Sequence, residues 1–366
     1  MKSILVFRPA ALGDFVMSSP ALREVRKNFP ERHVVLLTVP SITKDQRVRV
    51  SKYTGDRLSV PWLELVMPHL VDEFFILDSV THLGFLWNLR RKLRSFHFEA
   101  VILMIDSGAK WQGRIKKVLL MFFLVGFVPV LGWRGPGTLT GNRVGLKKRG
   151  LLRHHVHGPL HFLAELNPPK IYKDEDLVFD LRPGQVAEEW VSDWLVENKK
   201  ESKRLVAIAP GSIQPHKRWP EQSFMELISR LLAAYPDVAI VVLGTPDDKG
   251  LGETLMTISS KRIFNLAGVT SIVQSAALLR KCALLVGNDG GAAHLADAMG
   301  CQVVSIIPGI EYPDSVEPWH NKALAVRYPV SCAPCYNFIF CPEKHNNCMK
   351  DLPVNLVLEN CKKVLG

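Results

Sequence analysis

Several signatures of common protein classes are missing from this 366-residue sequence. The first apolar run is followed by Arg8-Pro-Ala-Ala-Leu-Gly-Asp14, which is not a G-x-G-x-x-G loop, and no Walker A motif with its lysine occurs. Dinucleotide-dependent dehydrogenases and P-loop NTPases are therefore disfavoured. The sequence also has no helix-turn-helix, zinc-finger or RNA-binding signature, so we expect no nucleic-acid partner.

Hydrophobic runs long enough to cross a membrane are also missing. Residues 118–133 form a sixteen-residue uncharged stretch that Gly126 and Pro129 interrupt, whereas a membrane-spanning helix needs roughly 20 residues. The N-terminal run Ile4–Phe7 is too short for the core of a signal peptide, and no small-residue cleavage site follows it. We therefore expect a cytoplasmic protein.

Acidic residues are scarce in the first part of the chain. Residues 1–160 contain 25 Lys+Arg and 11 Asp+Glu, a net charge of +14, whereas the remaining residues contain 21 and 24, a net charge of −3. This asymmetry indicates that the first part faces something anionic, such as nucleic acid, a membrane surface or a phosphorylated substrate. Nucleic acid is the weakest of these options, because the binding signatures are missing. Basic residues on both sides of the uncharged stretch are compatible with an anionic bilayer; a buried core helix is the other interpretation of its apolar part.

Strand-like and helix-like segments alternate along both halves of the chain, which predicts parallel sheets covered by helices on both faces. We expect two Rossmann-like domains, residues 1–169 and 170–350, joined near Asn167-Pro-Pro169, and a final helix within 351–366. The expected strands are 4–7, 34–38, 74–77, 100–105, 128–131, 206–209, 238–243, 264–265, 283–286 and 303–307. The expected helices are 21–28, 86–96, 110–124, 220–235, 251–259, 272–280, 292–299 and 352–365.

A turn with two glycines, within Gly287-Asn-Asp-Gly-Gly291, joins a predicted strand to a predicted helix. Glycine lets a ligand approach the backbone closely. The helix start offers unpaired N–H groups and a positive dipole end, both suited to phosphate, and His294 in the first turn can donate to a phosphate oxygen. The segment predicts an anion site; the alternative is that the glycines serve turn geometry alone.

Two further segments also follow predicted strands. Arg8-x-x-x-Leu-Gly-Asp14, with Pro20-Ala-Leu22, follows the first strand, and Pro210-Gly-Ser212, with Lys217-Arg-Trp-Pro220, follows the first strand of the second domain. Together with Asn288–His294, and in this order, they resemble glycosyltransferase family 9, the ADP-heptose:lipopolysaccharide heptosyltransferases, over essentially the whole chain.

The resemblance implies an α/β GT-B fold: two facing Rossmann-like domains with parallel sheets and an interdomain cleft. The N-terminal domain would bind the acceptor and the C-terminal domain the nucleotide sugar, and the last helix would cross back to the N-terminal domain. The implied reaction is the inverting transfer of heptose from ADP-heptose to the inner core of lipopolysaccharide.

Sugar transfer needs a base for the acceptor hydroxyl and a cation for the departing diphosphate. Asp14 matches the family's catalytic aspartate; its alternative role is a helix N-cap. Lys217 matches the lysine that contacts the donor diphosphate. Asp247 and Asp248 compete for the family's acidic position near the ribose. The other donor-binding candidates are Gly13, Ser212, Asp289, Gly290, Gly291 and His294.

The resemblance also implies an anionic, lipid A-linked oligosaccharide as acceptor, met at the cytoplasmic face of the inner membrane, where we expect peripheral association. Candidate acceptor-binding residues in the basic first part are Arg90, Arg94, Lys110 and Arg114. Alternative functions are transfer from another nucleotide sugar, nucleotide-sugar epimerisation, and nucleotide-sugar binding without catalysis.

No metal or cofactor is required for transfer in a GT-B enzyme, so we expect none at the reaction site. Four of the seven cysteines nevertheless cluster late in the chain, and four thiols at such spacing could hold a structural zinc ion; reduced, unliganded thiols are the alternative. They are Cys332, Cys335, Cys341 and Cys348.

Overall fold

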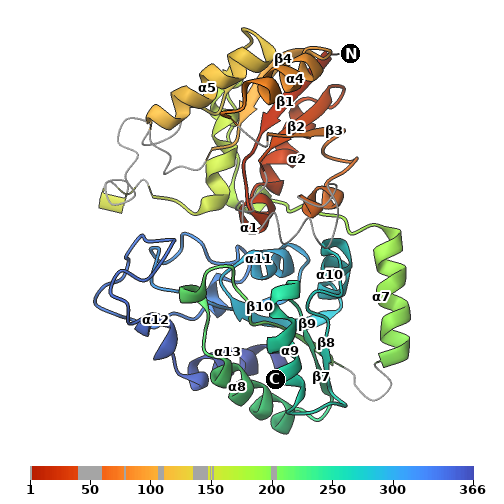
Figure 1. Cartoon of the computed structure of the whole chain (residues 1–366), viewed down its shortest axis with the longest axis vertical. Coiled ribbons are helices and arrows are strands. Elements are labelled where there is room, and N and C mark those ends of the chain that lie inside the picture. Colours follow the sequence, from red (N-terminus) through yellow and green to blue (C-terminus); the bar gives the residue numbers. More distant parts are fainter. Residues whose placement is uncertain are drawn as a thin grey trace. The chain divides into compact units, whose positions relative to one another are not determined.

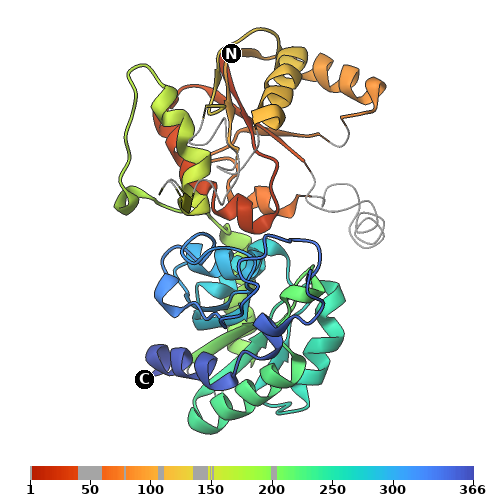
Figure 2. The ribbon, with the colours of Figure 1, turned by 90° about the vertical axis from the view of Figure 1, so that its left-hand side faces the viewer.

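The computed structural model describes residues 2–39, 60–77, 80–105, 111–134, 147–148, 150, 152–198 and 204–366. The chain divides into two units, Met1–Leu181 and Arg182–Gly366. Each unit is built on a five-stranded parallel sheet with helices on its faces (Figures 1 and 2). The predicted α/β class with two parallel sheets is confirmed.

The sheet of the first unit has the strand order β3-β2-β1-β4-β5. Its strands are apolar almost throughout, as parallel strands covered on both faces require. They are β1 (Lys2–Phe7), β2 (His33–Thr38), β3 (Glu73–Ile76), β4 (His97–Leu103) and β5 (Val130–Leu131). The helices are α1 (Leu12–Val16), α2 (Ser19–Asn28), α4 (Leu83–Leu93) and α5 (Trp111–Val125), with 3-10 helices η2 (Pro61–Leu65), η3 (His155–Glu165) and η4 (Asp174–Asp176).

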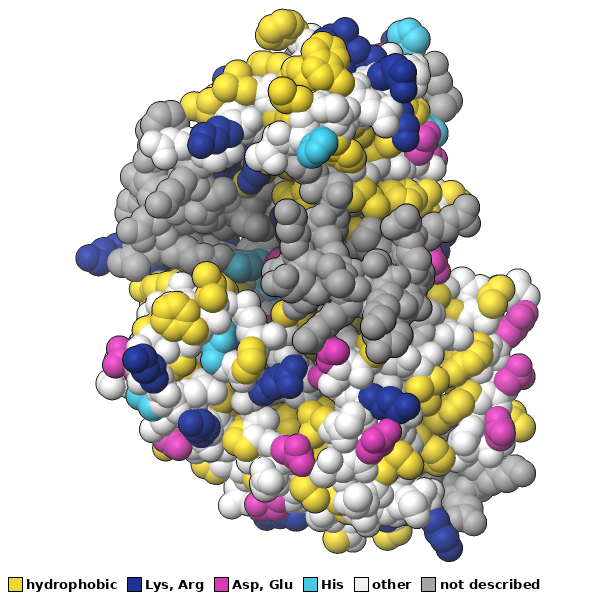
Figure 3. Space-filling model, viewed as in Figure 1, with side chains coloured by type: hydrophobic (Ala, Val, Ile, Leu, Met, Phe, Trp, Pro, Cys, Tyr) yellow, Lys and Arg dark blue, Asp and Glu magenta, His cyan; other side chains and the backbone are white. Residues whose placement is uncertain are grey.

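Helices α4 and α5 cover one face of this sheet side by side. Leu86, Leu89 and Leu93 recur at helical spacing on α4 and are buried with β1, β2 and β4, and Met121 and Leu124 of α5 join the same cluster. The opposite side of the two helices is exposed, and Figure 3 shows hydrophobic side chains gathered over this part of the first unit, with Lys and Arg beside them. In the described parts of the chain, no helix is long and apolar enough to span a membrane.

The sheet of the second unit has the order β10-β9-β6-β7-β8. The strands are β6 (Arg204–Ala209), β7 (Val238–Val242), β8 (Ile263–Asn265), β9 (Cys282–Asn288) and β10 (Gln302–Ile306). The helices are α7 (Gln185–Asn198), α8 (Glu221–Ala234), α9 (Lys249–Met256), α10 (Ile272–Leu279), α11 (Gly291–Ala298), α12 (Asn347–Lys350) and α13 (Val354–Leu365), with 3-10 helices η5 (Pro215–Lys217), η6 (Pro246–Asp248) and η7 (Lys322–Leu324).

The final helix differs from the prediction that it crosses to the first domain. The apolar stripe of α13, which includes Val357, Leu358 and Cys361, is buried in the core of the second unit with α8 and the central strands. The guanidinium of Arg204 at the start of β6 also donates to the carbonyl of Leu365, at 2.6 Å. Helix α13 therefore completes the core of the second unit.

The boundary between the units also lies later than the predicted residue 169. The amide of Lys170 donates to Leu163 O at 2.9 Å, and the Tyr172 hydroxyl lies 2.8 Å from His157 Nδ1. His69 Nε2 lies 3.0 Å from Asp180 O. These contacts attach residues 170–181 to the first unit.

Candidate functional site

The carboxyl ends of β6 and β9 bring two of the predicted segments together. The two strands pair in parallel, with Ala209 opposite Gly287, so the loops that follow them start at the same edge of the sheet. The buried Asn288 side chain links them: its Oδ1 accepts from Trp219 N at 2.9 Å, and its Nδ2 donates to Pro210 O at 2.7 Å. Asn288 thereby fixes the turn that carries Lys217, a role the sequence motif does not reveal.

Lys217 and Asp289 form a largely buried ion pair at this edge. Lys217 Nζ lies 2.9 Å from Asp289 Oδ2, and the two side chains are 18% and 11% exposed. His294 Nε2 lies 3.9 Å from the other carboxylate oxygen. Burial by itself would raise the pKa of Asp289, but the charges of Lys217, His294 and Arg327 outweigh it and hold that pKa below its usual range. The carboxylate is therefore ionised and keeps the ammonium at the start of α11.

The two-glycine turn is open at Gly290. A Cβ added at Gly290 would meet nothing closer than Asn288 O at 3.9 Å, whereas one added at Gly287 would lie 2.7 Å from Ala209 O. Gly287 therefore serves strand packing and Gly290 leaves space. Helix α11 begins at Gly291, the residue after Gly290, and the first-turn amides of a helix have no intrahelical acceptors. The arrangement suits an anionic ligand.

The two acids after β7 occupy different environments. Asp248 is buried, and its Oδ2 accepts from the backbone and hydroxyl of Thr245 at 2.9 and 2.7 Å. A Cβ at Gly211 would collide with the Asp248 carboxylate, so these two residues are packed together. Asp247 is exposed. Asp248 is committed to shaping the loop after β6, which leaves Asp247 as the accessible acid.

Ser212 lies in the loop after β6, where its hydroxyl accepts from the amide of Gln214 at 3.4 Å. Its carbonyl accepts from Arg218 Nε at 2.8 Å. The side chain is half-buried. These contacts give Ser212 a role in the geometry of the turn that carries Lys217.

In the first unit, Asp14 lies in the first turn of α1 and is half-buried. The helix begins after Ala11, which occupies the N-cap position, so the N-cap alternative for Asp14 is wrong. Gly13 precedes it in the same turn. The fully buried Arg8 donates to Met104 O and to Asp14 O, each at 3.0 Å. Arg8 thus connects α1 to the end of β4. Arg8 is part of the sequence motif, but the motif alone does not indicate this role.

Comparison with known proteins gives the family. The family model for glycosyltransferase family 9 (heptosyltransferase) matches residues 86–344, well over half of the chain. The chain belongs to glycosyltransferase family 9.

Curated members of this family are similar over much of the chain. Lipopolysaccharide heptosyltransferase 2 of Escherichia coli K12 is 24% identical over 340 residues, which cover 88% of this chain and 87% of that protein. Lipooligosaccharide heptosyltransferase 2 of Campylobacter jejuni serotype O:2 is 27% identical over 217 residues, 58% of this chain and 64% of that protein. The chain thus spans just under two thirds of the Campylobacter relative.

A solved structure, that of E. coli ADP-heptose lipopolysaccharide heptosyltransferase II, has the same fold. It matches with a TM-score of 0.68 at 21% sequence identity, covering 99% of this chain and 98% of that one.

The predicted acceptor-binding residues of this family 9 chain differ in how exposed they are. Arg114 is fully buried and donates to Trp133 O at 3.1 Å, so we correct its prediction as an acceptor contact: it supports the packing of α5. Arg90 of α4 is half-buried, and Arg94, which directly follows α4, is exposed. Lys110 lies outside the described residues.

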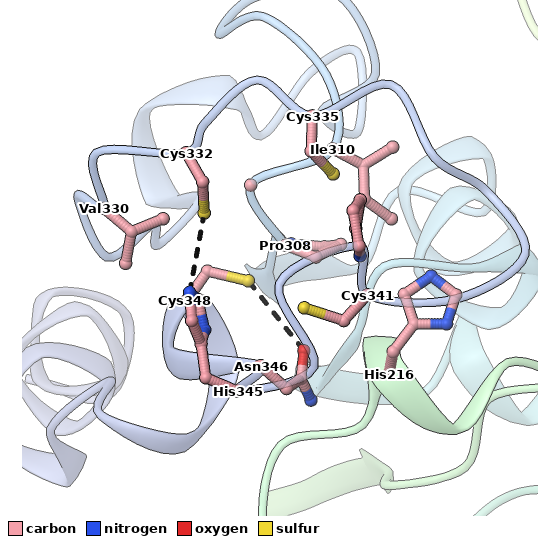
Figure 4. A pocket seen from close by; sticks show the side chains of 12 residues that line it. His216, Pro308, Ile310, Val330, Cys332, Cys335, Cys341, His345, Asn346 and Cys348 are labelled. Carbon is pink, nitrogen blue, oxygen red and sulfur yellow. Dashed lines mark hydrogen bonds between the residues drawn. The ribbon is translucent and has the colours of Figure 1, made fainter.

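The four clustered cysteines line one pocket, together with His216 and His345 (Figure 4). Cys332 Sγ lies 3.9 Å from His345 Nε2, and burial raises the pKa of the Cys348 thiol. Among the residues that the structure describes, no three His, Cys, Asp or Glu side chains are arranged to hold a metal ion. The zinc site stays a prediction. The other three cysteines are buried, as expected of small core residues: Cys282, Cys301 and Cys361.

Proposed function

We propose that this chain is an inverting heptosyltransferase, which moves heptose from ADP-heptose to the inner core of lipopolysaccharide. The observation that supports it most is the open space at Gly290, which adjoins Asp289, the ion-pair partner of Lys217, and Gly291, the first residue of α11. A diphosphate placed there meets a cation and free amides together. Relatives of similar length, such as the E. coli protein, are named lipopolysaccharide heptosyltransferases.

In this proposal Lys217 stabilises the leaving group. When the bond between the anomeric carbon and the diphosphate breaks, negative charge develops on the departing oxygen. An ammonium and helix amides already aimed at that position stabilise the charge without reorganisation. Asp289 orients Lys217, and the His294 imidazole donates to a phosphate oxygen. Asp247 is our candidate for the ribose hydroxyls, and Ser212 and Gly291 contribute further donors.

Asp14 is the general base in this proposal. As a carboxylate it accepts the proton of the acceptor hydroxyl while the hydroxyl oxygen attacks the anomeric carbon from the face opposite the diphosphate, which inverts the configuration. The reaction requires no metal, because lysine and helix amides supply the positive charge. The acceptor is an anionic, lipid A-linked oligosaccharide, with Arg90 and Arg94 as candidate contacts, met at the cytoplasmic face of the inner membrane.

A panel of nucleotides tests the donor. We expect ADP and ADP-heptose to raise the melting temperature, and uridine compounds to have little effect. At a ligand concentration about 100 times Kd the stabilisation is about 2.7 kcal/mol. A clear preference for uridine compounds would contradict the ADP-heptose proposal. A UDP-GlcNAc 2-epimerase of Methanocaldococcus jannaschii matches with a TM-score of 0.51 at 14% identity, which is a likeness of fold alone, and no feature of the site favours epimerisation.

A further inference from the structure

The outward side of α5 is apolar although it faces solvent. Ile115, Leu119 and Phe122 are spaced i, i+4 and i+7 and therefore share one side of the helix, and Leu119 is 59% exposed. The inward side carries Met121 and Leu124, which are buried. A helix that is apolar on both sides is ordinarily surrounded by other apolar material. The outward side of α5 therefore requires a nonaqueous neighbour.

The apolar surface continues from α5 onto α4 and onto the turn after α5. Trp87 of α4 packs edge-on against Phe123, with ring centroids 5.6 Å apart, and Phe122 contacts Phe127 at 5.1 Å. Trp87 is 58% exposed, and Phe127 is 91% exposed. Single exposed hydrophobic residues are ordinary, but a connected set of this kind marks an interaction surface.

The charged residues of the two helices have one sign. Neither α4 nor α5 contains an acidic residue. The Arg90 guanidinium lies over the rings of both Trp87 and Phe123, 5.4 and 4.9 Å from their centroids, so a cation is held at the border of the aromatic cluster. The other basic residues of the border are Arg91, Lys92, Arg94, Lys116 and Lys117.

We propose that this surface rests on an anionic phospholipid bilayer. Its apolar part, the membrane face, consists of Leu83, Trp87, Ile115, Leu119 and Phe127. Apolar side chains enter the boundary between headgroups and acyl chains, and the basic border meets the lipid phosphates. A tryptophan beside an arginine suits the depth of the headgroups. The inference rests on the proposed function, because a lipid-linked acceptor has to be reached at such a surface.

Helix α7 shows that exposed apolar residues alone do not mark a surface for an anionic bilayer, because the charge around them also matters. Val186 and Val196 are 82% and 74% exposed, comparable with the membrane face. Helix α7, however, carries four acidic and no basic residues: Glu188, Glu189, Asp193 and Glu197. An anionic bilayer would repel this helix, so α7 provides a matched control within the same chain.

The test is co-sedimentation of the full chain with vesicles made either of phosphatidylcholine alone or of equal parts phosphatidylethanolamine and phosphatidylglycerol. We expect binding to the anionic vesicles only, and loss of that binding near 1 M salt, where the screening length falls to about 3 Å. Leu119→Ser with Phe127→Ser should weaken binding roughly tenfold or more. Arg91→Gln with Lys92→Gln should weaken it about fivefold per residue. The control Val186→Ser with Val196→Ser should bind like the wild type.

Equal binding by the Leu119/Phe127 double variant and the wild type would overturn the inference. So would a lipid-free dimer in sedimentation velocity that the same variant dissociates, because the face would then join two copies of the chain. The melting-temperature response to ADP-heptose, measured on every variant, keeps the two proposals apart. A normal response without vesicle binding refutes the membrane face alone, and vesicle binding without any donor response refutes the donor proposal.

Discussion

Replacing Lys217 by methionine tests the ion pair on which the donor site depends. At the observed 2.9 Å, two unit charges attract by about 6 kcal/mol at an effective dielectric constant of 20. Desolvation of the two groups offsets part of this attraction. Removal of one partner of a buried pair typically costs 3–5 kcal/mol, because the other charge stays buried without compensation. His294 and Arg327 still support the Asp289 carboxylate, so we expect a loss of about 3 kcal/mol in the ligand-free protein.

The double variant Lys217→Met/Asp289→Asn separates charge from packing. It leaves no buried charge without its partner, so most of the lost stability should return, and the pairwise coupling energy should be about 2 kcal/mol or more. Urea unfolding of the four proteins, followed by tryptophan fluorescence, measures this cycle. Both variants should nevertheless lose roughly 10²–10³ in kcat, because the departing diphosphate has lost its cation.

The control for this cycle is Arg230→Met, which removes an exposed partner of Glu226 on α8 and should change stability by less than about 1 kcal/mol. A double variant as unstable as Lys217→Met would refute the electrostatic account of the pair. Full transferase activity in the double variant would refute the leaving-group role of Lys217.

Three further predictions concern the framework of the two units. Arg8→Gln should lower kcat much more than it changes the melting-temperature response to donor, because it frees α1 from β4, and Arg8→Lys should recover only part of the rate. Burial, together with nearby basic groups, lowers the pKa of His161 to about 4, so the unfolded chain takes up that proton first. Protonation of His161 therefore costs no stability above pH 6.5, and the free energy of unfolding falls by about 3 kcal/mol between pH 6.5 and 4. Urea unfolding of His161→Gln across this range should show a shallower decline, and an unchanged slope would contradict the assignment. Gly287→Ala should lower the melting temperature of the ligand-free protein, whereas Gly290→Ala should spare it and weaken donor binding; the reverse pattern would contradict the roles given to the two glycines.

The sequence predicted most of the regular structure because the relevant patterns are local. Strands β1 and β9 are continuous apolar runs, and α8 buries Phe224, Leu227 and Leu231 at helical spacing. Helix α7 was missed because its buried residues, Ala187 and Val191, form a narrow stripe among acidic residues. The five residues of α1 are too few to display a period.

The sequence motifs indicated the residues of the candidate site but not the contacts that join them. The order of Asp14, Lys217 and the glycine turn along the chain indicated the family, which the family model then matched. The contacts of Asn288 with Trp219 and Pro210 join residues 69 and 78 positions apart, which no local pattern records. The packing of α13 on the second unit was mispredicted for a related reason: an apolar stripe shows that a helix packs but not which core it joins.

In the proposed mechanism, Asp14 takes the proton from the acceptor while the second unit holds ADP-heptose. Its most direct test compares wild type and Asp14→Asn for transfer to a lipid A-linked acceptor and for donor binding, with the anomeric configuration of the wild-type product read by nuclear magnetic resonance. We expect the variant to bind ADP-heptose normally and lose at least about 10²-fold in transfer, and the wild-type product to have the configuration opposite to the donor. Undiminished transfer by Asp14→Asn, or a product that retains the donor configuration, would contradict the account.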